Sequence, residues 1–89
     1  MVRQEVIIAN KLGLHARAAA RFVQLASGFA SEIKVGRNGK EVNGKSIMGV
    51  MMLAAGQGTP IEIMASGQDE EEAVQSLATL VVNRFGEPE

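Results

Sequence analysis

The stretch EIKVGRNGKEVN, residues 32–43, decides how the middle of this chain folds. Ile33 and Val35 alternate with polar residues, which is the pattern of a strand with one buried face. Asn38-Gly39 follows, and this dipeptide is the strongest short-range signal for a tight hairpin turn. The chain then returns through KEVN, so residues 32–43 are predicted to form a hairpin.

Further strands and helices are predicted on both sides of this hairpin. β-branched residues predict a strand in EVIIA, residues 5–9, and alternating isoleucines predict another in PIEIMA, residues 60–65. Apolar residues at helical spacing predict a helix in HARAAARFVQLAS, residues 15–27, which Gly28 ends. Strands therefore flank the hairpin in sequence, and a helix separates the first strand from it.

Two more helices are predicted from the residues at their starts. Ser46 stands where an N-cap is expected, although Gly49 and Gly56 limit the helix after it to one or two turns. Asp69 is predicted to cap the last helix, with Glu72 three residues later completing a capping box. The full order of elements is therefore β-α-β-β-α-β-α.

This order predicts an α+β fold, with a four-stranded, mostly antiparallel sheet and three helices on one face. At 89 residues the chain has room for a single domain, residues 1–89. The apolar run near the N-terminus is too short for a signal peptide or a membrane span, and cysteine is absent. We therefore expect a cytoplasmic protein.

Charge and aromatic content argue against a nucleic-acid partner. Nine basic and ten acidic residues give a formal net charge of -1, so no overall positive field draws the chain onto nucleic acid or an anionic membrane. A small RNA-binding α/β module would need aromatic side chains on its strands for base stacking. The chain has three phenylalanines and no tyrosine or tryptophan, and no phenylalanine falls in a predicted strand.

The stretch GKEVNGKS, residues 39–46, matches the phosphate-binding pattern G-x-x-x-x-G-K-[ST]. Such a loop must leave a buried parallel strand and wrap its backbone N–H groups around phosphates. Here Gly39 belongs to the hairpin turn, and Lys40 to Asn43 form the predicted return strand. The strand PIEIMA offers only Glu62, on its outward face, as a magnesium partner. We therefore expect no nucleotide binding.

His15 is the only histidine, and it lies between a glycine-containing loop and a predicted helix start. The free N–H groups of that first turn favour an anion, and Arg17 adds a guanidinium that grips phosphate or carboxylate oxygens. Nothing marks a serine and an acid as triad partners, and one histidine without cysteine cannot anchor a usual zinc site. Two alternatives remain: a surface histidine without function, or an imidazole that accepts a phosphoryl group covalently.

The motifs GLHAR, residues 13–17, followed by an alanine-rich helix, and VNGKSIMGVMMLA, residues 42–54, resemble the histidine-containing phosphocarrier (HPr) proteins of the bacterial phosphoenolpyruvate-dependent phosphotransferase system. The resemblance covers essentially the whole chain and implies an open-faced β-sandwich. It implies a carrier and not an enzyme, without cofactor or metal. His15 would take a phosphoryl group on Nδ1 from phospho-enzyme I and pass it to enzyme IIA proteins, with Arg17 as charge partner. Many members have proline where this chain has Ala18.

The resemblance also assigns roles to the short helix after Ser46. Ser46 would be phosphorylated by an ATP-dependent HPr kinase/phosphorylase in addition to capping the helix. A helix this short cannot bury all its apolar residues, so we expect a docking patch for partner proteins and a monomeric chain. A regulatory protein of a nitrogen- or carbon-control branch without sugar transport remains the alternative. The predicted patch consists of Ala16, Arg17, Ala20, Ile47, Met48 and Met51.

Overall fold

The computed structural model describes all 89 residues and has the predicted order of elements. A single 3₁₀ turn, η1, follows the last helix. The elements are β1 (Val2–Ile7), α1 (Ala16–Ser27), β2 (Glu32–Arg37), β3 (Lys40–Asn43), α2 (Ile47–Met51), β4 (Pro60–Ser66), α3 (Glu70–Val82) and η1 (Arg84–Gly86). No helix has the length and apolar character that crossing a membrane requires.

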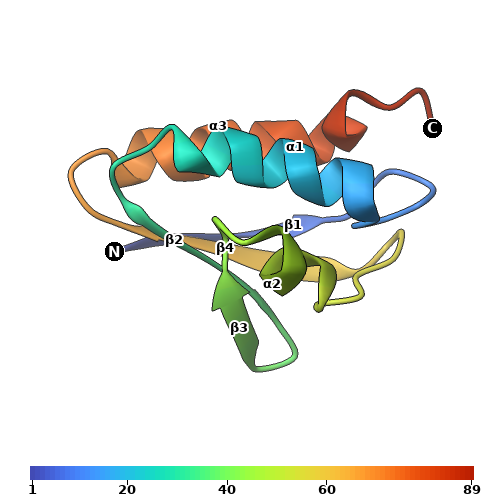
Figure 1. Cartoon of the computed structure of the whole chain (residues 1–89), viewed down its shortest axis with the longest axis horizontal. Coiled ribbons are helices and arrows are strands. Elements are labelled where there is room, and N and C mark those ends of the chain that lie inside the picture. Colours follow the sequence, from blue (N-terminus) through green and yellow to red (C-terminus); the bar gives the residue numbers. More distant parts are fainter.

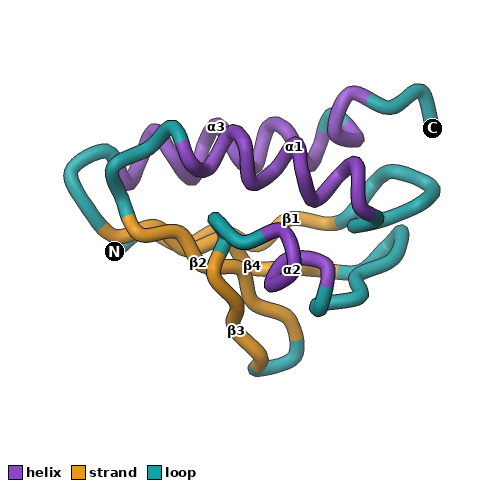
Figure 2. Tube along the Cα trace, viewed as in Figure 1, coloured by secondary structure: helices purple, strands orange, loops and turns teal.

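The four strands form one antiparallel sheet in the order β1-β4-β2-β3. Helices α1 and α3 lie side by side over one face of this sheet, and α2 lies near the β2–β3 hairpin (Figure 1). Figure 2 shows the same two layers, with the strands below the two long helices and the opposite face of the sheet uncovered. The predicted α+β fold, an open-faced sandwich, is confirmed.

The hydrophobic core fills the space between the sheet and the helices. Val35 of β2 and Ile63 of β4 are fully buried, and Phe22 of α1 and Leu77 of α3 pack against the same cluster. Val50 extends the core into α2 and is also fully buried. Burying each such side chain contributes roughly 1.5–3 kcal/mol, so α2 is held by packing although it has only five residues.

The predicted hairpin turn is confirmed at residues 38 and 39. Asn38 and Gly39 both have positive φ angles, 52° and 81°, as a two-residue type I′ turn requires. Arg37 pairs with Lys40 on either side of the turn. The turn sets the register of the whole hairpin, in which Val35 lies opposite Val42.

The first strand is displaced from its predicted position. It runs over Val2–Ile7 and not residues 5–9, because its partner β4 extends from Pro60, opposite Ile7, towards Ala65, opposite Val2. Apolar content alone favoured the later residues, whereas the length of the partner strand decides the bounds. Ile8 still donates a backbone hydrogen bond to Thr59, at 3.0 Å, which directs the chain into the loop before α1.

The predicted capping box at the start of α3 is wrong. Asp69 stands at the N-cap position but makes no side-chain cap hydrogen bond. Its carboxylate accepts hydrogen bonds from the N–H groups of Ala30 and Ser31, each at 2.9 Å, and from the Ser31 hydroxyl at 2.5 Å. The Ser31 hydroxyl is the largest cause of the lowered pKa of Asp69. Asp69 therefore joins the β4–α3 and α1–β2 loops instead of closing its own helix.

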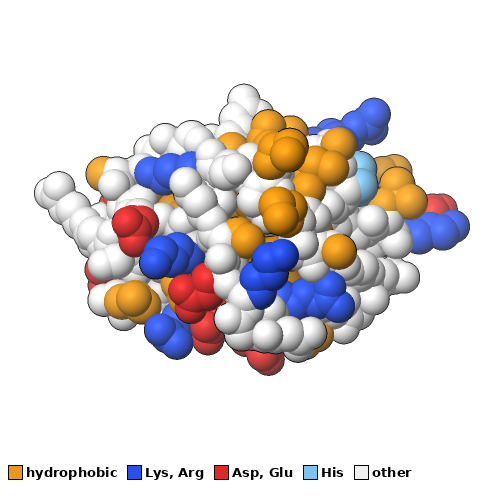
Figure 3. Space-filling model, turned by 60° about the horizontal axis from the view of Figure 1, so that its bottom comes forward, with side chains coloured by type: hydrophobic (Ala, Val, Ile, Leu, Met, Phe, Trp, Pro, Cys, Tyr) orange, Lys and Arg blue, Asp and Glu red, His pale blue; other side chains and the backbone are white.

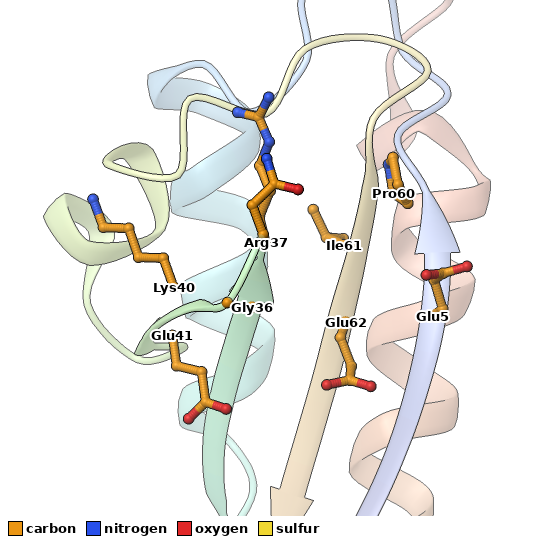
Figure 4. Close-up of a pocket in the computed structure, with 10 residues that line it drawn as sticks. Glu5, Gly36, Arg37, Lys40, Glu41, Pro60, Ile61 and Glu62 are labelled. Carbon is orange, nitrogen blue, oxygen red and sulfur yellow. The ribbon is translucent and has the colours of Figure 1, made fainter.

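The uncovered face of the sheet carries a hollow lined by three glutamates and two basic residues, Arg37 and Lys40. Across the strands Glu5 lies opposite Glu62, Glu62 opposite Gly36, and Gly36 opposite Glu41. Glu41 and Glu62 lie on either side of Gly36, and Glu5 lies beyond Glu62 on β1 (Figure 4). Met64 also faces this side but is only 3% exposed. Its methyl group lies against Gly36, where an added Cβ atom would come within 3.3 Å of it.

Candidate functional site at the start of helix α1

The loop before α1 positions His15 by a close backbone contact. Leu14 donates a backbone hydrogen bond to the carbonyl of Ala55, at 2.9 Å. Gly13 has a φ of 67°, and a Cβ atom there would lie 2.5 Å from the same carbonyl oxygen. Only glycine satisfies both the left-handed conformation and the close approach. The glycine in the motif GLHAR therefore fixes where the histidine enters the helix.

The first turn of α1 offers free hydrogen-bond donors. The His15 carbonyl accepts the first helical bond, from Ala19 at 2.9 Å, and the N–H groups of Ala16, Arg17 and Ala18 make no hydrogen bond within the chain. The His15 side chain does not cap the helix. These donors and the positive end of the helix dipole make the start of α1 favourable for an anion.

The imidazole of His15 is held through one nitrogen only. Nε2 lies 2.5 Å from Oε2 of Glu87, a residue 72 positions later in the chain. Nδ1 makes no hydrogen bond, and the His15 side chain is 28% exposed. The ring is thus anchored on the Nε2 side, and its second nitrogen is free to react.

The carboxylate of Glu87 is in turn held by Asn10. The Asn10 side-chain amide donates to Oε1 of Glu87 at 2.9 Å and to the carbonyl of Gly13 at 2.8 Å. Burial alone would raise the pKa of Glu87, but the hydrogen bonds from Asn10 and His15, with the nearby charges of His15 and Arg21, outweigh burial and lower it. Glu87 is therefore an ionised acceptor at neutral pH.

The C-terminal segment reaches the site through an unusual backbone turn. Arg84, Phe85 and Gly86 have positive φ angles of 58°, 55° and 79° in succession. A left-handed conformation costs roughly 1–2 kcal/mol at each of the two residues that carry a side chain. The burial of Phe85 and a hydrogen bond from the Arg21 guanidinium to its carbonyl hold the turn.

Arg17 is the second residue of α1, with its side chain exposed and without an ion pair or hydrogen bond. Together with His15, Glu87 and Leu12 it lines an open hollow at this end of the molecule. Figure 3 shows the histidine at the surface, next to apolar side chains and close to basic ones. The guanidinium is thus a positive charge in the same hollow as His15 that no other group of the chain holds.

An apolar surface adjoins this hollow. In α2, Ile47, Met48 and Met51 are 43%, 73% and 40% exposed, while Ala16 is exposed and Ala20 half-buried on the neighbouring helix α1. The structure thus brings the residues of the predicted patch onto two packed helices. Two further exposed apolar residues, Leu12 and Met52, lie on the loop before α1 and at the end of α2 and were not foreseen.

Ser46 has the cap geometry that the sequence predicts. Its hydroxyl accepts a hydrogen bond from the N–H of Gly49, at 3.1 Å, and its side chain is partly exposed. The neighbouring Lys45 amine donates to the Phe29 carbonyl at 2.7 Å, and Lys40–Asn43 pair as strand β3. The GKEVNGKS stretch is thus a turn, a strand and a helix cap, and it does not form a phosphate-wrapping loop.

No group of three or more histidine, cysteine, aspartate or glutamate side chains is arranged to hold a metal ion. The groups that the structure brings together at the start of α1 are the imidazole, the free N–H groups and the guanidinium. The structure brings together His15 and Arg17, which the sequence singled out, with Asn10 and Glu87, which it did not. No local pattern marks Glu87, because its contact with His15 depends on the turn at Arg84–Gly86.

Known proteins are similar to this chain in both sequence and fold. The family described as PTS HPr component phosphorylation site matches residues 2–83. The phosphocarrier protein HPr of Cupriavidus necator is 54% identical over 89 residues, the full length of both chains. The chain belongs to the HPr family. Its role is accordingly that of a phosphocarrier protein in the phosphotransferase system.

Solved structures of HPr proteins agree closely with this one. A crystal structure of HPr-C-His from Thermoanaerobacter tengcongensis has a TM-score of 0.95 and 49% identity, and the match covers 100% of both chains. The protein Crh of Bacillus subtilis is 48% identical with a TM-score of 0.77, over 94% of this chain and 97% of that chain. That structure is described as a catabolite-repression protein forming a dimer with a swapped domain. The monomeric state expected for this chain stays a prediction.

Proposed function

We propose that His15 accepts a phosphoryl group on Nδ1 from phospho-enzyme I and passes it to enzyme IIA proteins. The observation that carries the proposal is the position of the ring: Nδ1 is unpartnered at a helix start whose first three N–H groups are free. Arg17 supplies a mobile positive charge beside it. The resemblance to HPr proteins supports the same residues.

The transfer step uses the lone pair of a neutral imidazole. Nδ1 forms the bond to phosphorus as the bond between phosphorus and the donor breaks, and the bonding electron pair stays with the donor. The incoming phosphoryl oxygens meet the free N–H groups of Ala16, Arg17 and Ala18 and the Arg17 guanidinium, which stabilise the charge that they carry. Transfer to enzyme IIA is the reverse of this step.

The exposed residues of α2 are the docking surface in this proposal. Ile47, Met48 and Met51 present flexible apolar side chains, which suit a protein that must bind both a donor and several acceptors. Ala16 and Ala20 leave the surface of α1 low enough for a partner to approach His15. Enzyme I and enzyme IIA would bind this patch in turn, each placing its own reactive group over Nδ1.

Phosphorylation by enzyme I and phosphoenolpyruvate tests the proposal. Intact mass is measured for the wild-type chain and for His15→Ala after incubation with both components. We expect one phosphoryl group on the wild type and none on the variant, whose helix should persist because His15 makes no cap bond. Equal incorporation in the variant would contradict the carrier assignment to His15.

A regulatory role is a second candidate that the similarity to Crh favours, since that protein is described by its part in catabolite repression. In this reading Ser46 receives phosphate from a kinase, and the cytoplasmic chain binds regulatory partners without supplying a sugar permease. The two roles separate by one measurement. If the phosphorylated chain passes its phosphoryl group to no enzyme IIA protein of its own organism, the regulatory role is favoured.

A further inference from the structure

The C-terminal segment packs next to His15 and is held there by hydrogen bonds to residues near the start of the chain. The Glu89 carbonyl accepts a hydrogen bond from the Lys11 N–H at 3.0 Å, and the Arg21 guanidinium donates to the Phe85 carbonyl. Between these two anchors Glu87 is only partly exposed, with 11% of its side chain accessible. The two anchors leave Glu87 directed at His15.

Strained backbone accompanies this placement. Arg84 and Phe85 both adopt left-handed conformations, although neither is glycine. Residues with side chains keep a left-handed backbone conformation only where surrounding contacts enforce it, and such residues are concentrated at functional sites. The turn reverses the chain after α3, and a regular helical continuation past Val82 would carry Glu87 away from the loop before α1.

Asn10 fixes the orientation of the Glu87 carboxylate. It is fully buried, and both of its amide protons point at acceptors, the Gly13 carbonyl and Oε1 of Glu87. Since both neighbours are acceptors, the amide nitrogen and not the oxygen must face them. Its own oxygen has no partner. A buried unpaired oxygen is unfavourable, so this asparagine is placed for the two bonds that it donates.

An ionised carboxylate can only accept hydrogen bonds. At 2.5 Å from Oε2 of Glu87, Nε2 of His15 must therefore be the ring nitrogen that carries a proton. In the neutral imidazole the other nitrogen then holds a lone pair. That nitrogen is Nδ1, which has no hydrogen-bond partner and lies at the start of α1.

We propose that Glu87 is a positioning residue for His15: it keeps the proton on Nε2 and presents the Nδ1 lone pair to the incoming phosphoryl group. The inference rests on the proposed function, which it deepens. When the bond from Nδ1 to phosphorus forms, Nε2 keeps its proton and the ring becomes cationic, so no proton needs to enter or leave. The Glu87 carboxylate neutralises this ring charge, and the ring returns to its neutral form when the phosphoryl group moves on.

Glu87→Gln tests the proposal, and Glu89→Gln is the matched control. Both remove one carboxylate from the same tail, but Glu89 contacts Lys11, at 3.6 Å, and not His15. The first readout is the tautomer of the neutral His15 ring by ¹⁵N NMR, recorded at increasing pH until the ring signals no longer change. We expect a single Nε2–H tautomer in the wild type and in Glu89→Gln. Glu87→Gln should give a mixture, since an amide can donate as well as accept.

The second readout is single-turnover phosphoryl transfer from phospho-enzyme I. A carboxylate that holds an imidazole tautomer can contribute orders of magnitude to a rate, so we expect a loss of roughly tenfold or more in the rate constant for Glu87→Gln at unchanged KM. Glu89→Gln should transfer at the wild-type rate. A tautomer mixture in the wild type, or a normal rate in Glu87→Gln, would overturn the proposal. Neither result touches the assignment of His15, which the mass of His15→Ala decides separately.

Discussion

Two helices of this protein begin at a residue that is proposed to accept phosphate, and the two side chains make opposite kinds of contact. At α2 the Ser46 hydroxyl turns into its own first turn and accepts from Gly49, three residues later. At α1 the His15 imidazole turns away from its helix and bonds Glu87, 72 residues later. One helix start is therefore closed by its own cap, and the other is left open with its N–H groups free.

The difference fits a structural role for Ser46 and the reactive role proposed for His15. The Ser46 hydroxyl accepts a hydrogen bond from its own helix and so stabilises that helix. The His15 imidazole is held by Glu87 and donates or accepts no hydrogen bond at its own helix start. The free N–H groups there remain available for the oxygens of a phosphoryl group. The predictions below test whether the two starts are as different in function as they are in geometry.

The largest effect is expected at the open helix start. Arg17→Ala should slow phosphoryl transfer from phospho-enzyme I by about tenfold to a hundredfold, since one well-placed charged contact to a transferring group is worth a few kcal/mol. The Tm should be nearly unchanged, because the Arg17 side chain makes no ion pair or hydrogen bond. Single-turnover transfer rates and a thermal melt measure the two quantities.

Arg3→Ala is the control for this change. Arg3 is also an exposed arginine, but it lies on β1 and approaches Glu62, at 3.6 Å, on the uncovered face of the sheet. Its loss changes the net charge by the same amount without touching the site, so transfer should remain at the wild-type rate. If both variants slow transfer equally, Arg17 acts only through overall charge.

A smaller effect is expected when charge is added at the closed helix start. Ser46→Asp keeps a good N-cap for α2, so the free energy of unfolding should stay within about 1 kcal/mol of the wild type. The added carboxylate lies beside the exposed Met48 and Met51, where enzyme I is proposed to dock. An unfavourable interaction of about 1 kcal/mol there raises KM about fivefold with little change in kcat.

Ser46→Asn separates charge from shape in this experiment. Asparagine has nearly the size of aspartate and caps helices equally well, but it is neutral. We expect its KM for enzyme I to match the wild type. A raised KM in both variants would assign the effect to the bulk of the side chain, and a normal KM in both would leave Ser46 with its capping role alone.

Local chemistry explains what the sequence could predict. The Asn38-Gly39 turn and the Ser46 cap depend on neighbouring residues only, and both are found. The predicted cap hydrogen bond of Asp69 was wrong, because its carboxylate accepts instead from the N–H groups of Ala30 and Ser31, nearly 40 residues earlier. The motif that points to His15 and Arg17 is equally local, and the roles of these two residues stay predictions.

The missed part of the site depends on contacts between distant segments. Glu87 reaches His15 only because Arg84 and Phe85 adopt left-handed conformations, which residues with side chains rarely do. That turn is fixed by the burial of Phe85 and by the hydrogen bond from Arg21 to the Phe85 carbonyl. No sequence motif predicts either contact. Three-dimensional packing, and no motif, therefore completes the environment of His15.

The smallest expected effect is on the free energy of unfolding, whose dependence on pH should differ between substitutions at the two helix starts. Ser46→Ala removes a cap worth about 1 kcal/mol, and this cost should not change with pH because neither the hydroxyl nor the Gly49 N–H titrates. Glu87→Gln removes a carboxylate whose folded pKa lies below its ordinary value of 4.5. A lowered folded pKa contributes stability that is fully present above 4.5 and is lost as the pH falls through the folded value.

Urea unfolding of the wild type and both variants at several values between about pH 7 and pH 2.5 measures these contributions. Each variant is compared with the wild type at the same pH, so the titration of Asp69, Glu70 and the other carboxylates cancels. The cost of Ser46→Ala should stay level, whereas the cost of Glu87→Gln should shrink below about pH 4.5. A cost for Glu87→Gln that is equally level would mean that the carboxylate charge does not hold the tail against His15, and that the two helix starts are both maintained by neutral contacts.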